Sequence, residues 1–297
     1  MRNNKLVGTG VALITPFNED YSIDYNSLDN LIDNLINNNI DYVVVMGTTA
    51  ESATLSNLEK NQVLNHVKSK INGKIPIVFG VGGNDTNDVV SFMRDIDFNG
   101  IEAILSVCPY YNKPTQDGLF SHFEQIAIHS PVDIILYNVP SRTSVNIDVD
   151  TIRKLAVKYD NIVAIKEASG DIEKAMEIIS NVPDDFMLIS GDDKMTFPIM
   201  SLGGCGVISV QAMAFPDLFT NMVKYLLNQD LASAKKIHYK LLQSVDWFYI
   251  DGNPAGIKQA LFFLHICSSN QLRLPLVKMS KKHAEKLCSL VNNTINN

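Results

Sequence analysis

Lys166 is the residue whose setting in this sequence most strongly suggests chemistry, because it ends an apolar run over residues 162–166. Such a run is typical of a strand buried on both faces, and alternation places Lys166 on the face of Ile162 and Ala164. A lysine taken out of water loses its proton more easily, and the neutral amine attacks carbonyl carbon to form a Schiff base. The structural alternative is a lysine whose stem lies along apolar surface while its ammonium stays in water.

Other polar side chains follow short apolar runs elsewhere in the chain. Thr48 and Thr49 come soon after residues 42–46, and Tyr137 ends the run over residues 133–137. Hydroxyls gathered around an amine can pass a proton to and from a carbinolamine, as Schiff-base formation and hydrolysis both require. Each residue also has a structural explanation, since threonines cap helices and tyrosines pack against cores. The catalytic interpretation therefore depends on elements that bring these residues together.

Short β-branched runs alternate with amphipathic stretches along the first 230 residues. The runs, about eight in number, cover residues 11–15, 42–46, 75–79, 101–107, 133–137, 162–166, 186–190 and 206–210. The amphipathic stretches have apolar residues at helical spacing and include residues 27–38, 57–70, 87–98, 117–129, 148–159 and 171–180. Strict alternation of strand and helix predicts parallel strands joined by helical crossovers.

The number of these units predicts an α/β fold, a (β/α)8 TIM barrel over residues 1–230. Residues 231–250, 254–265 and 278–290 have helical periodicity without new strands. Residues 231–297 are therefore predicted to form a small C-terminal helical subdomain. In such barrels the chemistry takes place where the strands end, which is where the polar residues above lie.

Composition narrows the classes of function. The chain has 297 residues, of which 46% are hydrophobic and 19% charged, enough for a substantial core. A net charge of -7 without a long Lys/Arg run argues against binding to nucleic acid or an anionic membrane. No apolar stretch has transmembrane length, the N-terminus lacks a signal-peptide pattern, and the cysteines form no Cys-x-x-Cys pair. We therefore expect a reduced, cytoplasmic protein that acts on small molecules.

Four motifs together resemble the pyruvate-dependent class I aldolases and lyases, the family of dihydrodipicolinate synthase and N-acetylneuraminate lyase. The motifs are GTTAESATL at residues 47–55, PYYNKPTQ at 109–116, YNVPSRT at 137–143 and IKEASG at 165–170. The resemblance extends over essentially the whole chain. It implies a barrel enzyme that needs neither a cofactor nor a metal.

The resemblance also implies roles for individual residues. Lys166 is expected to form the Schiff base with pyruvate and Tyr137 to transfer protons beside it, while Thr49 and Tyr111 complete the relay. In the family the tyrosine at the position of Tyr111 reaches the neighbouring subunit, so a dimer is the expected catalytic unit and two tight dimers the common assembly. The positions expected to bind substrate or line the pocket are Thr48, Thr49, Arg142, Gly191 and Ile208.

Arg142 distinguishes between branches of the family. A guanidinium binds a carboxylate through two hydrogen bonds, which suits the carboxylate of L-aspartate 4-semialdehyde. The implied reaction condenses pyruvate with that semialdehyde to give 4-hydroxy-tetrahydrodipicolinate, the entry step of diaminopimelate and lysine biosynthesis. Two alternatives stay open. One is another pyruvate-dependent aldolase such as N-acetylneuraminate lyase, and the other is a noncatalytic ligand sensor.

The sequence departs from the family pattern at two places. Ala50 replaces the usual glycine after the two threonines, and it would be strained if the backbone there required positive φ. In lysine-inhibited members, two histidines and a glutamate contribute to a second site that binds lysine. Asn57, Lys60 and Asp88 occupy those positions here. Because the Lys60 ammonium repels a cationic ligand, weak or absent inhibition by lysine is expected.

Overall fold

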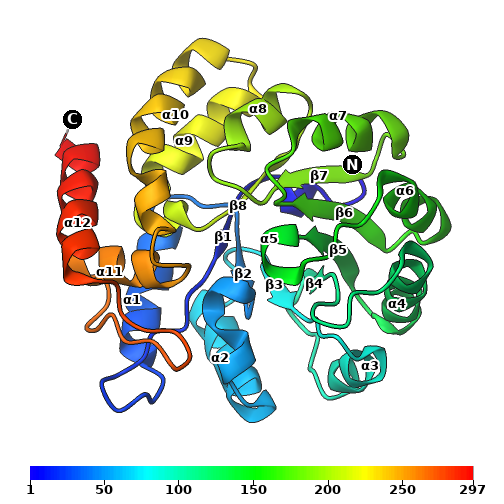
Figure 1. Ribbon diagram of the computed structural model, residues 1–297, viewed down its shortest axis with the longest axis horizontal. Coiled ribbons are helices and arrows are strands. Elements are labelled where there is room, and N and C mark those ends of the chain that lie inside the picture. Colours follow the sequence, from blue (N-terminus) through cyan, green and yellow to red (C-terminus); the bar gives the residue numbers. More distant parts are fainter. Residues whose placement is uncertain (297) are drawn as a thin grey trace.

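The computed structural model describes residues 1–296, and in it eight parallel strands close into a barrel in the order β1 to β8 (Figure 1). The strands are β1 (Gly8–Ala12), β2 (Tyr42–Val45), β3 (Ile77–Gly80), β4 (Ala103–Val107), β5 (Asp133–Asn138), β6 (Ile162–Glu167), β7 (Met187–Ser190) and β8 (Gly206–Ser209). The predicted α/β barrel is confirmed.

Helices surround the barrel and connect its strands (Figure 1). They are α1 (Tyr25–Asn37), α2 (Asn57–Ile71), α3 (Thr86–Arg94), α4 (Gln116–His129), α5 (Pro140–Thr143), α6 (Val149–Lys158), α7 (Ile172–Asn181), α8 (Thr196–Ser201) and α9 (Pro216–Leu227). Three more follow the barrel: α10 (Leu231–Val245), α11 (Ala255–Phe263) and α12 (Lys281–Asn296). Among residues 1–296, no helix combines the length and the apolar character needed to cross a membrane.

Side-chain caps fix where several helices begin. Asp24 and Thr115 accept hydrogen bonds from backbone N–H groups in the first turns of α1 and α4. At the start of α2, Ser56 and Glu59 form a reciprocal capping box. These local interactions determine where the loops at the carboxyl ends of the strands end.

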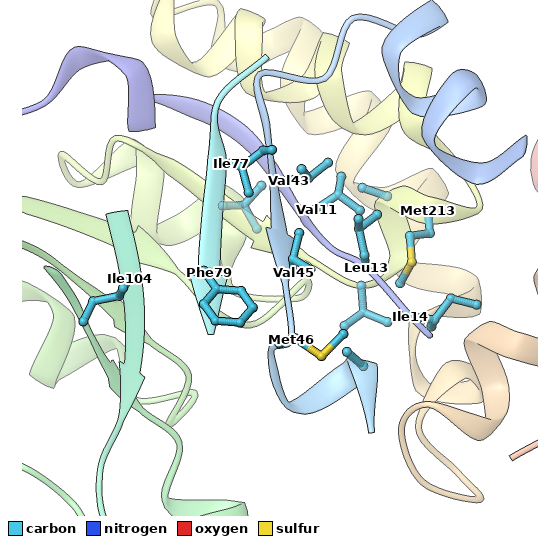
Figure 2. Close-up of a cluster of buried hydrophobic side chains, with 14 of the residues drawn as sticks. Val11, Leu13, Ile14, Val43, Val45, Met46, Ile77, Phe79, Ile104 and Met213 are labelled. Carbon is cyan, nitrogen blue, oxygen red and sulfur yellow. The ribbon is translucent and has the colours of Figure 1, made fainter. Parts of the chain in front are cut away.

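Alternation along the strands divides the core into two layers. Outward-facing residues such as Val43, Val45 and Phe79 belong to the cluster between the strands and the helices (Figure 2). Inward-facing residues such as Val44 and Ile135 belong to a second cluster inside the barrel. Both clusters consist of buried apolar side chains, so a charged residue such as Lys166 on the inner face is unusual.

The predicted first strand is wrong by three residues, since β1 spans Gly8–Ala12 rather than 11–15. Glycines usually weaken a strand, but here they are needed for close packing. A Cβ on Gly10 would lie 2.3 Å from the Tyr42 ring, which the barrel encloses. The apolar run continues past β1 into the loop, where Leu13 donates its backbone N–H to Val44.

The predicted face of Ile162 is also wrong. The pairing of β5 with β6 shifts register between Ile134 and Ile135, so that Ile134 pairs with Ile162 and Ile135 with Ala164. This irregularity places Ile162 in the outer cluster, whereas Val163 joins the inner one with Ala164. A bulge interrupts simple alternation, and period-two reasoning does not detect it.

The C-terminal residues form a helical region, as predicted. Helix α10 packs against α9, and the buried Gln211 side chain donates hydrogen bonds to Leu241 and Ser244 of α10. The boundary between residues 230 and 231 stays a prediction.

Candidate active site at the carboxyl end of the barrel

Lys166 and Tyr137 lie side by side at the ends of β6 and β5. The two residues pair directly in the parallel ladder, which brings their side chains to the same height in the barrel. The Lys166 Nζ atom lies 4.3 Å from the centroid of the Tyr137 ring. Both residues are about 95% buried, with exposed fractions of 4% and 5%. The lysine does not extend to solvent, so the structural alternative of a snorkelling side chain is wrong.

Gly191 leaves room for the Lys166 side chain. A Cβ at this position would lie 3.0 Å from the Lys166 Cε atom and 2.7 Å from the Ala168 Cβ atom. The Gly191 backbone N–H donates to the Glu167 carbonyl at 2.7 Å and holds the loop after β7 against the end of β6. Ile208, at the end of β8, is buried in the same interior cluster as Tyr137. These two predicted positions are thus close to the lysine or its tyrosine partner.

A polar network on the other face of β6 fixes the residue after the lysine. The buried Glu167 carboxylate accepts hydrogen bonds from Asn138 Nδ2 at 2.9 Å and from the Ser169 backbone N–H at 2.6 Å. Lys174 Nζ lies 4.0 Å from the same carboxylate. Burial lowers the pKa of Lys174 from its ordinary value of 10.5, although Glu167 opposes that shift. The strand end that carries Lys166 is therefore fixed from outside the barrel.

Thr48 and Thr49 lie in a short 3₁₀ turn, Thr48–Ala50, directly after β2. The Thr15 hydroxyl, in the loop after β1, donates to the Ala50 carbonyl at 2.7 Å and stabilises the turn. Ala50 does not have a positive φ, whereas Glu51 does, at 55°. Alanine is therefore accommodated without strain, and Ala50 packs in the outer hydrophobic cluster. The strain considered from the sequence does not arise.

The C-terminal helical region reaches back to this threonine loop. Lys258 of α11 forms a fully buried ion pair with Glu51 and also donates to the Gln271 carbonyl. Asn253, just before α11, donates from Nδ2 to the Thr49 hydroxyl at 3.0 Å. Desolvation lowers the pKa of Lys258 to about 8, against the opposing effect of Glu51. Removing one partner of such a buried pair typically costs about 3–5 kcal/mol.

Neither Asn253 nor Lys258 was singled out from the sequence. Each lies about 200 residues from its partner, with separations of 204 for Asn253 and Thr49 and 207 for Lys258 and Glu51. Lys258 lies in an apolar helical stretch, and Asn253 lies just before it. As with Lys166, a lysine in an apolar stretch indicates burial, but the sequence does not identify its partner.

Arg142 lies in α5, the short helix after β5, and is exposed at the rim of the barrel. Its Nη2 atom donates to the backbone carbonyl of Asn253 at 3.2 Å. The guanidinium thus has a defined position and keeps donors for a ligand.

A cavity of about 370 Å³ opens at this end of the barrel. Thr48, Tyr137, Arg142 and Asn253 contribute to its lining, together with Tyr110. Five of the predicted site residues do not line the cavity, namely Thr49, Tyr111, Lys166, Gly191 and Ile208. Tyr137 contacts both the cavity and the Lys166 amine, so it connects the open space with the buried nitrogen.

Tyr111 is the predicted site residue that the fold does not bring to the others within one chain. It is 89% exposed and has a φ of 72°, in the loop after β4. Asn84 and Asn112 hold that loop, because each donates a side-chain hydrogen bond to a backbone carbonyl of the opposing segment. The Tyr111 side chain is therefore exposed on a held loop and is not part of the cavity lining, although Tyr110 beside it is.

Asp193 connects the loops after β7 and β8 with the C-terminal region. Its buried carboxylate accepts hydrogen bonds from the backbone N–H of Gln211 at 2.9 Å and from the Tyr249 hydroxyl at 3.2 Å. Burial raises the pKa of Asp193 above its ordinary value of 3.8. Its contacts are with the protein framework, in keeping with a structural role.

A closed parallel barrel with a cavity and a buried lysine at the carboxyl ends of its strands defines a (β/α)8-barrel enzyme. Residues 5–294 match the model of the dihydrodipicolinate synthetase family, and the chain belongs to this family.

Individual relatives agree with that assignment. The chain is 49% identical over 277 residues to the 4-hydroxy-tetrahydrodipicolinate synthase of Parabacteroides distasonis, covering 93% of each protein. The crystal structure of dihydrodipicolinate synthase from Aquifex aeolicus superposes with a TM-score of 0.94 at 39% identity, covering 97% of this chain and 98% of that one. The chloride-inhibited dihydrodipicolinate synthase of Acinetobacter baumannii, crystallised with pyruvate, also has a TM-score of 0.94, at 34% identity, covering 97% and 99%.

Proposed function

We propose that this chain condenses pyruvate with L-aspartate 4-semialdehyde to give 4-hydroxy-tetrahydrodipicolinate, the entry step of diaminopimelate and lysine biosynthesis. The names of relatives at 41–49% identity support this reaction. The observation that carries the proposal is the buried Lys166 amine beside Tyr137. Among residues 1–296, the Lys166 Nζ atom makes neither an ion pair nor a hydrogen bond, and it lies over the Tyr137 ring. A buried amine without an anionic partner is available as a nucleophile.

In the proposed reaction the Lys166 amine attacks the keto carbon of pyruvate to give a carbinolamine. Loss of water leaves an imine, and loss of a proton from the methyl carbon leaves an enamine. The enamine carbon then attacks the aldehyde carbon of the semialdehyde, and the new alkoxide takes up a proton. Finally the amino group of the semialdehyde attacks the imine carbon, which closes the ring and frees the lysine. Every stage needs proton transfer, for which Tyr137 and Thr49 are the proposed groups.

Substrate positions follow from the loops around the cavity. Thr48, with the backbone near Gly191 and Ile208, is proposed to bind the pyruvate carboxylate. Arg142 is proposed to bind the carboxylate of the semialdehyde, because its guanidinium lies at the cavity rim and is held by the Asn253 carbonyl. The two carboxylates would then lie at the inner and outer ends of one cavity.

A dimer is proposed as the smallest active unit, in which Tyr111 completes the proton relay of a neighbouring copy. The support is its 89% exposure on a loop held by side-chain hydrogen bonds, together with its absence from the lining of the cavity in its own chain. Two such dimers are the proposed full assembly.

Trapping the Schiff base tests the proposed chemistry. The protein is incubated with pyruvate, reduced with borohydride and digested, and mass spectrometry locates the adduct, which is expected on Lys166. Lys166→Ala should give no adduct, and an adduct on another lysine contradicts the mechanism.

Arg142→Ala provides the matched variant in the same experiment. It should be trapped by pyruvate as the native protein is, while kcat/KM for the semialdehyde falls by about 10²-fold or more, as expected for a lost charged contact. Equal loss of trapping and turnover would mean that Arg142 is structural. Trapping without semialdehyde turnover in the native protein would favour another aldolase, and no trapping would favour a ligand sensor.

A further inference from the structure

We propose that Asn253 is a positioning residue that sets the direction in which the Thr49 hydroxyl donates its proton. This inference deepens the proposed function and rests on it, because it takes Thr49 to be a member of the proton relay. It concerns a residue outside the barrel and outside the four motifs.

The contact is specific in its geometry. Asn253 Nδ2 donates to Thr49 Oγ1 at 3.0 Å, from the connection before α11 to the turn after β2. The Asn253 Oδ1 atom is buried and accepts no hydrogen bond within residues 1–296. Within residues 1–296, the contact with Thr49 is thus the only hydrogen bond that the Asn253 side chain makes.

This donor constrains the Thr49 hydroxyl. A hydroxyl group has one proton and two lone pairs, so an oxygen that accepts from Asn253 keeps its own proton for a different partner. Among residues 1–296, the Thr49 hydroxyl donates to no side chain or carbonyl, so its proton is not used by the protein framework. That proton is then available to the other groups of the proposed relay.

Other contacts hold the same loop without using the Asn253 amide. The buried pair of Glu51 and Lys258 fixes the loop two residues after Thr49. Thr15 supports the Ala50 carbonyl, and the Asn253 backbone carbonyl, which accepts from Arg142, is independent of the side chain. Removing the Asn253 amide should therefore let the Thr49 hydroxyl rotate freely, while the loop and Arg142 stay in place.

The test compares four variants with the native enzyme: Thr49→Val, Asn253→Ala, Asn253→Asp and Thr49→Val/Asn253→Ala. Asn293→Asp, at an exposed position of α12, is the control for a charge change in the same C-terminal region. Asp at 253 has the shape of Asn but only accepts, so it draws the Thr49 proton away from the site. The measurements are kcat, KM for each substrate, the pH dependence of kcat/KM, and the thermal midpoint.

We expect kcat to fall about 3- to 10-fold in Asn253→Ala, the equivalent of one neutral hydrogen bond, and further in Asn253→Asp. KM for the semialdehyde should not change, whereas the pH dependence of kcat/KM should, because the variant alters a group of the proposed proton relay. In the Thr49→Val background, Asn253→Ala should have no additional effect on kcat, because the effects of two substitutions that remove the same contact do not add.

Three results would overturn the inference: native-like activity of Asn253→Asp, additive effects in the double variant, or a fall in activity matched by a fall in thermal midpoint with an unmoved pH profile. If Thr49→Val itself is fully active, the proposed role of Thr49 fails as well. If Thr49→Val is impaired and the double variant is additive, only the role of Asn253 fails.

Discussion

The left-handed backbone in the threonine loop falls on Glu51, not on the alanine before it. Glu51 has a φ of 55°, and this conformation costs a residue with a side chain about 1–2 kcal/mol. The Glu51 carboxylate accepts the Arg273 backbone N–H at 3.0 Å and pairs with Lys258, so its contacts offset that cost. Because the left-handed conformation lies at Glu51, position 50 does not require glycine.

Lys60 is the residue that governs the expected response to lysine. It lines a cavity of about 460 Å³ with Asn57, Asp88 and Tyr110, and its Nζ lies 5.5 Å from the centroid of the Phe92 ring. A second ammonium in this cavity would be repelled. We expect native activity at millimolar lysine in a steady-state assay at neutral pH.

The matched variant for this prediction is Lys60→Gln, which removes the charge and nearly keeps the size. Burial lowers the pKa of Lys60 from its ordinary value of 10.5, so any inhibition should grow as the pH rises and Lys60 loses its proton. Strong inhibition of the native enzyme at neutral pH, unchanged in Lys60→Gln, would show that Lys60 does not control the cavity.

At the scale of elements, an ion pair and hydrogen bonds join the segment between α11 and α12 to the start of α2. Arg273 forms an ion pair with Glu59 at 2.6 Å and donates to the carbonyls of Tyr21 and Thr54. The side chains of Arg273 and Glu59 are mostly buried, with exposed fractions of 19% and 27%. The loop that carries the threonines is therefore held from its far end as well.

This ion pair predicts a pH-dependent contribution to stability. Arg273 holds the pKa of Glu59 at about 2, below its ordinary value of 4.5. A depressed carboxyl pKa stabilises the fold above about pH 4.5, and this contribution is lost as the pH falls toward 2. The difference in unfolding free energy between native protein and Glu59→Gln should be largest near pH 7 and shrink below pH 4.5, as measured by urea denaturation. Asp150→Asn, which removes two exposed ion pairs, with Arg153 and Lys154, is the control and should change stability by only about 1 kcal/mol or less. A Glu59→Gln effect that is constant with pH would mean that packing, not charge, holds the segment.

The sequence allowed the barrel, its strand count and the helical C-terminal region to be predicted, because strand and helix periods alternate clearly. It did not allow the start of β1 to be placed, since Gly8 and Gly10 resemble loop residues until the enclosed Tyr42 ring is known. Nor did it reveal the bulge before Ala164, which depends on the register with β5.

The same distinction applies to the site. The places of Lys166, Tyr137, Thr48 and Arg142 at the carboxyl end of the barrel could be predicted because each ends or closely follows a recognisable strand, whereas their roles stay predictions. Asn253 could not, because its function depends on a partner 204 residues away and it lacks a local pattern. Its contact to Thr49 exists only in the folded chain.

At the scale of the whole molecule, the proposed dimer makes a quantitative prediction for mixed subunits. Lys166→Ala and Tyr111→Phe should each be nearly inactive alone. A heterodimer of the two has one site with an intact lysine and an intact tyrosine from its neighbour. After random reassortment of equal amounts, about a quarter of the sites should be active in the synthase assay.

Mixing without dissociation is the control for that experiment and should restore no activity. If Tyr111 serves its own chain instead, each site of the heterodimer lacks one of the two groups, and reassortment restores no activity either. The result thus separates a site shared between copies from one that a single chain completes.

The contacts from Asn253, Lys258 and Arg273 to residues 49–59 also bear on how the protein is made. During synthesis the proposed nucleophile emerges well before these three residues, each of which follows its partner among residues 49–59 by 204 to 214 positions. A nascent chain that has completed all eight strands has Lys166 but lacks these contacts to residues 49–59. We therefore expect a chain that ends before Asn253 to have little or no turnover in the synthase assay.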